Sequence, residues 1–180
     1  MNPKKALLAS MLLACTVALP GPGGSARAQP GVDIPQSVRM EHESVVAYLS
    51  NIATRKSATG KAAQKLIDVL KEHMAFEEAV VLPPLVLLPE ISAGKITPDM
   101  RWAIALSDQV KADQQGKLLR LHTAFTEAAL DLQQAAEDEQ DHATVGFVRD
   151  LAADDLADRE ITEPTVILIG EVLRAKLPAK

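Results

Sequence analysis

The chain has 180 residues, of which 47% are hydrophobic, 24% are charged and only 3% are aromatic. This length and apolar fraction suit one domain with its own core, and the scarcity of aromatic residues, together with many alanines and leucines, favours helices over sheets. The 24 acidic side chains outnumber the 19 basic ones, which argues against a nucleic-acid binder that needs a basic face. A single cysteine, Cys15, excludes an intramolecular disulfide framework and a cysteine-rich metal cluster.

Residues 1–28 have the pattern of a secretory signal peptide. Two lysines precede an apolar run over residues 6–19, and the Ala-Arg-Ala sequence at 26–28 provides the small residues that a signal peptidase reads. The run is shorter than the roughly 20 residues that span a bilayer, so we expect no permanent membrane anchor. The sequence therefore predicts export to the periplasm or the medium, with a mature domain over residues 29–180. The alternative is a lipoprotein in which Cys15 carries the lipid.

Apolar residues recur at helical spacing in four segments of the mature chain. The spacing predicts helices over residues 35–55, 61–87, 99–136 and 142–176, the third of them interrupted near Gly116. Because the connections between these segments are short or turn-like, neighbouring helices are expected to run antiparallel. The sequence predicts an all-α fold, an up-down-up-down four-helix bundle.

The two halves of this bundle look like copies of each other. Matching residues lie 80 or 81 positions apart, and one inserted residue in the second half explains the difference. Two similar helix pairs would then face each other across one core. The matched pairs are His42 with His122, His73 with Asp154, Glu77 with Asp158, and Pro83 with Pro164.

Six side chains that can bind metal fall on the predicted inner faces of the helices. His73 and Glu77 are four residues apart, so they lie on one helix face separated by one turn. Imidazoles and carboxylates that face a core cost free energy unless they are satisfied, and together they form a ligand set suited to iron, manganese or zinc. A purely structural hydrogen-bonded network is the alternative. The candidate metal ligands are His42, His73, Glu77, His122, Asp154 and Asp158.

The fourth histidine, His142, is not expected to join this set. It lies 12 residues before Asp154, which corresponds to about 18 Å along a helix. Asp141 is expected to cap the helix that begins there. The sequence therefore predicts that His142 faces solvent.

At these positions the chain resembles hemerythrin-like, or HHE cation-binding, domains. The resemblance is carried by Glu41-His42, by HMAFEEAVVLPPL over residues 73–85, and by Leu121-His122, and it covers residues 35–177. It implies a non-haem di-iron centre to which each half contributes a histidine and then an HxxxE pair. The residues that match the ligands of the family are His42, His73, Glu77 and His122.

The second half departs from the pattern of that family. Asp154 and Asp158 stand where the family has its second HxxxE pair, and Arg159 stands where the first half has Glu78. Aspartate is one methylene shorter than glutamate, so an oxygen at position 158 falls more than about 1 Å short unless the helix moves in, whereas ligand distances tolerate only about 0.2 Å. The site is therefore predicted to be either a carboxylate-rich variant or a decayed site that holds one metal ion or none.

The sequence leaves three functions open. The first is an exported hemerythrin-like protein that binds one or two non-haem iron ions, with manganese or zinc as alternatives, and handles O₂, iron or redox equivalents. The second is a metal-free bundle with a decayed site that acts as an interaction or structural module. The third is an oxidative enzyme that consumes peroxide, because open metal positions support redox chemistry. We expect a metal- or O₂-binding protein rather than a catalyst, and the sequence contains no HExxH, P-loop, GxSxG or GxGxxG motif.

Overall fold

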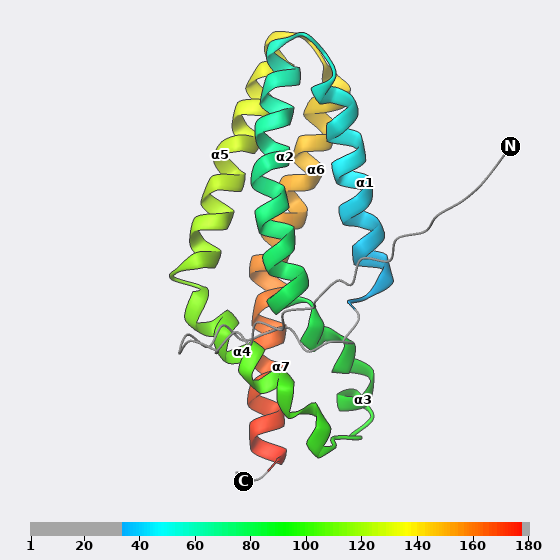
Figure 1. Cartoon of the computed structure of the whole chain (residues 1–180), viewed down its shortest axis with the longest axis vertical. Coiled ribbons are helices and arrows are strands. Elements are labelled where there is room, and N and C mark those ends of the chain that lie inside the picture. Colours follow the sequence, from blue (N-terminus) through cyan, green and yellow to red (C-terminus); the bar gives the residue numbers. More distant parts are fainter. Residues whose placement is uncertain (1–33, 178–180) are drawn as a thin grey trace, which may run out of the picture.

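The computed structural model describes residues 34–177. The predicted signal peptide, its cleavage site and Cys15 lie outside the described residues. Every element within the described range is helical, as the sequence predicts, and none of it is a strand (Figure 1). No helix in this range combines the length and the apolar character that crossing a bilayer would require.

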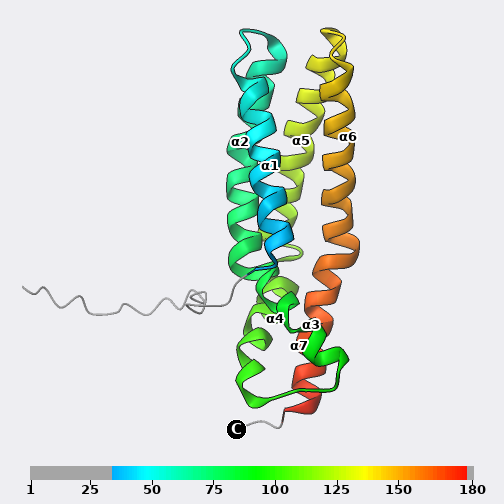
Figure 2. The same ribbon diagram turned by 90° about the vertical axis from the view of Figure 1, so that its right-hand side faces the viewer.

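Four long helices lie side by side, and each runs opposite to the one before it (Figures 1 and 2). Helix α2 packs against both α1 and α5, and α5 packs against α6. Their inner faces share one apolar core that includes Leu49, Leu66, Phe125 and Leu132. The four helices are α1 (Gln36–Ala53), α2 (Ala58–Phe76), α5 (Lys117–Asp138) and α6 (His142–Ala157).

Shorter helices form a second part of the molecule at one end of these four (Figure 2). There α4 packs against α7, around a core that includes Met100, Ile169 and Leu173. The short helix α3 and two 3₁₀ turns connect this part to α2. The elements are the 3₁₀ turn Pro83–Leu87, α3 (Leu88–Ser92), the 3₁₀ turn Pro98–Arg101, α4 (Trp102–Asp113) and α7 (Glu163–Lys176).

The helix boundaries confirm two details of the sequence analysis and correct a third. The predicted interruption near Gly116 separates α4 from α5. Asp141 caps α6, since its side chain accepts a hydrogen bond from the backbone N–H of Thr144, and His142 is exposed. The single helix predicted over residues 61–87 is wrong, because α2 ends at Phe76 and is followed by a π-helical turn and then by a 3₁₀ turn.

The helices widen into a π-turn at the same place in both halves. The turns Glu77–Val81 and Asp158–Thr162 lie 81 residues apart, which is the offset of the sequence repeat. In the first, the N–H of Leu82 donates to the carbonyl of Glu77, and in the second the N–H of Glu163 donates to that of Asp158. A proline follows each turn, and because proline has no N–H and its ring clashes with the preceding turn, a regular α-helix cannot continue there. Each widened turn therefore begins at a candidate ligand.

Candidate metal centre

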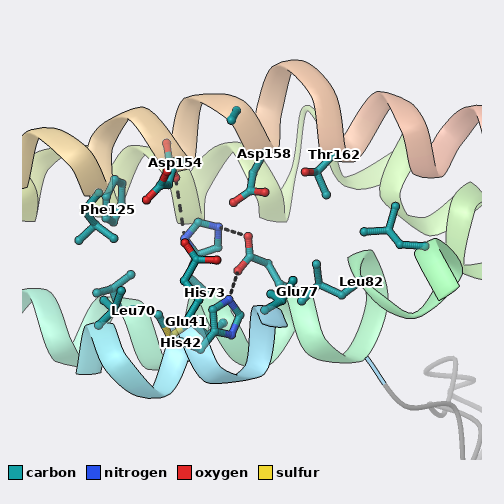
Figure 3. Close-up of a pocket in the computed structure, with 17 residues that line it drawn as sticks. Glu41, His42, Leu70, His73, Glu77, Leu82, Phe125, Asp154, Asp158 and Thr162 are labelled. Atoms are coloured by element: carbon teal, nitrogen blue, oxygen red, sulfur yellow. Dashed lines mark ion pairs between the residues drawn. The ribbon is translucent and has the colours of Figure 1, made fainter. Parts of the chain in front are cut away.

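A cavity of about 230 Å³ opens between α1, α2 and α6 (Figure 3). Its lining contains five carboxylates and two histidines and neither lysine nor arginine. Carboxylates gathered in a concave, partly apolar site create a negative potential that attracts cations. The acidic and imidazole groups that line it are Glu41, His42, His73, Glu77, Asp154, Asp155 and Asp158.

His73, near the end of α2, is the most deeply buried of these groups, with 4% of the residue exposed. Its Nε2 lies 3.3 Å from Oε1 of Glu77, within the distance of an ion pair, but it is buried without a hydrogen-bond partner. Its Nδ1 lies 3.9 Å from Oδ1 of Asp155. A buried polar atom without a partner costs about 1–3 kcal/mol, so His73 is a group that a bound cation would satisfy.

His42 on α1 lies at the edge of the same cavity. Its Nε2 is 3.6 Å from Oε2 of Glu77, and its Nδ1 is 3.0 Å from Oε1 of Glu78. The His42 side chain is 15% exposed and that of Glu78 is 41% exposed. The first half of the repeat thus presents a histidine and a buried glutamate that are accessible from the cavity mouth.

His122 on α5 lies deeper and is held between two carboxylates. Its Nδ1 is 2.7 Å from Oδ1 of Asp155, and its Nε2 is 2.7 Å from Oε1 of Glu163. Burial works to lower the pKa of His122, but the two carboxylates outweigh it and raise this pKa to about 9. The ring also packs edge-to-face against His73, with the centroids 4.8 Å apart.

His73, His122 and Asp155 are close enough to hold one metal ion. One ligand atom from each lies within 4.8 Å of the others, and all three residues are buried. Nitrogen and oxygen ligands bind such ions at about 2.0–2.2 Å, which puts two ligands of one ion roughly 3–4 Å apart, so the three donors need to move only slightly. With Nδ1 of His122 on the ion, Glu163 would orient the ring through Nε2, a frequent arrangement around metal-binding histidines.

Asp158 begins the second π-turn and is partly buried at the cavity wall. Burial raises its pKa, and the nearby charge of Glu77 raises it further, to about 6. The hydroxyl of Thr162 and the ring of His73 oppose this shift. A buried carboxyl whose pKa is raised by a neighbouring carboxylate is typical of a site that lacks a positive charge.

The structure places all six residues that the sequence proposes as ligands in or beside the cavity, but one of them is exposed. His73, Glu77 and His122 are buried, and His42 and Asp158 line the cavity. Asp154 lines the cavity but is exposed at its mouth, so its predicted burial on the apolar face of the helix is wrong. The buried acid is its neighbour Asp155, since one residue turns a helix by about 100°.

Two residues of this candidate site, Asp155 and Glu163, are not among the ligands that the sequence predicts. Asp155 continues the apolar spacing of Val148 and Leu151, which is the signal that favours it over Asp154. Glu163 carries no such signal, because in a regular α-helix it would point about 80° away from Asp155. The intervening π-turn rotates less per residue and brings both carboxylates to His122.

No family model matches the chain, and comparisons with curated proteins and with solved structures find no match either. The resemblance to hemerythrin-like domains therefore rests on the motif residues alone.

Proposed function

We propose that the chain is a hemerythrin-like metal-binding protein whose cavity holds non-haem iron in a carboxylate-rich variant of the family's site. The fold would be a four-helix bundle of two similar helix pairs, extended by α4 and α7. His73, His122 and Asp155 would hold the first ion. His42, Glu77 and Asp158 line the remaining space and would complete its coordination or hold a second ion.

The observation that carries this proposal is the unpaired Nε2 of His73. This nitrogen is buried in a cavity whose lining offers five carboxylates and no basic side chain. A structural network would satisfy such an atom with a hydrogen bond. A cation would satisfy it and would also neutralise the carboxylates, which otherwise repel each other as the raised pKa of Asp158 indicates.

Iron bound there would supply redox chemistry and open positions for O₂ or peroxide. The residues of the chain would position the ion and limit the access of water. Glu163 holds the ring of His122, and Phe125, Leu70 and Leu151 form the apolar wall of the cavity. The ordinary nitrogen and oxygen ligands also accommodate manganese or zinc, so metal selection depends on supply as well as on geometry.

Export is part of the same proposal. The mature domain would begin at Gln29, after cleavage in the Ala-Arg-Ala sequence, and the protein would act in the periplasm or the medium. Mass analysis of exported protein checks this. A mass that retains residues 1–28, or that includes a lipid on Cys15, would contradict it.

One observation favours a metal-free interaction module as a second candidate. His122 already makes two short contacts with carboxylates, so this part of the centre is satisfied without an ion. In that case the cavity would be what remains of an ancestral site. The two candidates differ in whether the purified protein contains metal.

Metal content per chain, measured on mature protein without a polyhistidine tag, tests the proposal. We expect one or two iron ions per chain in the wild type and a loss of most of this iron in His73→Ala. His142→Ala is the matched control, because His142 is exposed on α6 and should leave the iron content unchanged. Equal iron in all three proteins would contradict the assignment of this cavity, and absence of metal after growth with each candidate ion would favour the interaction module.

A further inference from the structure

Two exposed carboxylates flank the opening of the cavity. Glu41 belongs to α1 and Asp154 to α6, and Figure 3 shows them reaching the cavity from opposite walls. Within residues 34–177 neither side chain makes a hydrogen bond or an ion pair. Their charges are therefore available to a cation that arrives from solvent.

Further carboxylates line the cavity between this mouth and the buried Nε2 of His73. Asp158, one turn beyond Asp154 along the same helix, is partly buried, and Glu77 and Asp155 are only 7% and 8% exposed. The unpaired Nε2 of His73 lies at the inner end of this series. A cation that moves inward thus meets a carboxylate at each depth and exchanges its water ligands in steps.

The opposite face of α6 carries a basic side chain as well as acidic ones. Two further cavities reach His122 from that side, and Arg159 lines both of them. This guanidinium makes no hydrogen bond or ion pair within the described part of the chain, and it offsets part of the negative charge of Glu127, Glu160 and Glu163, which line the same two cavities. The cavity between α1 and α6, whose lining has five carboxylates and no lysine or arginine, is therefore the more favourable route for a cation.

We propose that Glu41 and Asp154 capture the metal ion at the mouth and deliver it to His73, and that they are not ligands of the bound ion. This inference rests on the proposed metal function. Because both side chains are solvated, they can bind an ion and release it without the cost of desolvating a buried charge. Steering by a charged cleft changes association rates by about 10–10³-fold, and salt screens it.

Stopped-flow mixing of the metal-free mature protein with Co²⁺, followed by the absorption of the bound ion, tests this role. The variant Glu41→Gln/Asp154→Asn is compared with Glu43→Gln/Asp150→Asn, which removes the same two charges from exposed positions on the same helices that do not line the cavity. We expect the first variant to bind Co²⁺ about tenfold more slowly at low ionic strength. The control should slow by less than about twofold, and the difference between the variants should shrink in 0.5 M NaCl.

Equilibrium affinity separates capture from coordination. The mouth variant and its control should bind Co²⁺ with the same affinity within about twofold, whereas His73→Ala should lose binding. Equal association rates in the two double variants would overturn the capture role. An affinity loss in the mouth variant that matches His73→Ala would overturn it by making these residues ligands, and a wild type that binds no Co²⁺ would remove the proposed function itself.

Discussion

His42 and His122 occupy matched positions in the two halves of the chain but have different surroundings. His42 lies at an open cavity edge, 3.6 Å from Glu77 and 3.0 Å from the exposed Glu78. His122 is buried, with a carboxylate 2.7 Å from each ring nitrogen. The histidine of the first half is therefore held by a contact that is open to water, whereas that of the second half is paired at both nitrogens in the interior.

One substitution within the repeat accounts for part of this difference. Arg159 stands at the position that matches Glu78, so the second half lacks the carboxylate that contacts His42 in the first. Glu163, four residues further on, contacts His122 instead. Because this carboxylate comes from beyond the π-turn, it is buried, and the pair that it forms is strong.

Replacement of each histidine by alanine should show the difference between the two halves most clearly. His122→Ala leaves Asp155 and Glu163 buried without a cation, so we expect the metal-free protein to lose about 3–5 kcal/mol of unfolding free energy. The matched change His42→Ala should cost less than about 1 kcal/mol, because its partner Glu78 is exposed. Urea unfolding at pH 7 in the presence of a chelator measures both, and equal losses would show that the two halves are not differently paired.

The paired histidine should also make stability depend on pH. Because the folded-state pKa of His122 is raised to about 9 from its ordinary value of 6.5, its stabilisation is complete below pH 6.5 and is lost as the pH rises through 9. We expect the unfolding free energy of metal-free protein to fall by at most about 3 kcal/mol over this window. His122→Gln should flatten the profile, and a slope that persists in this variant would assign the titration to another group.

The carboxylate partners should differ in their effect on metal affinity. Glu163→Gln removes the charge that orients His122, and loss of such a partner lowers metal affinity by about 10–100-fold. Glu78→Gln, the matched change in the first half, should lower it by less than about threefold, because that contact is exposed to water. Competition with a chromophoric chelator measures both affinities, and the reverse order would indicate that His42 binds the tighter ion.

The smallest effect is expected at the cavity mouth. Asp154→Leu should change the unfolding free energy of the metal-free protein by no more than about 0.5 kcal/mol, because Asp154 is exposed and unpaired. Asp155→Leu should destabilise it by several times as much, since it leaves the buried His122 with one carboxylate. Thermal unfolding in the presence of a chelator compares the two variants. A large loss of stability in Asp154→Leu would show that the Asp154 side chain is buried and paired.

The sequence predicts the candidate ligands that lie within regular helices. The four-residue spacing of His73 and Glu77 places both on the apolar face of α2, and His122 follows from the same periodicity in α5. The break near Gly116 and the cap at Asp141 are equally local features. Each depends on residues within one or two turns, so helix geometry alone is sufficient.

Only the tertiary structure decided which acids complete the site. The choice between Asp154 and Asp155 depends on how α6 is rotated against α2 and α5, and that rotation is set by packing of the whole core. The contact of Glu163 with His122 depends on the π-turn Asp158–Thr162, which changes the register between α6 and α7. Sequence periodicity assumes a rotation of about 100° per residue. It therefore cannot predict the direction of side chains that follow a turn with a different rotation.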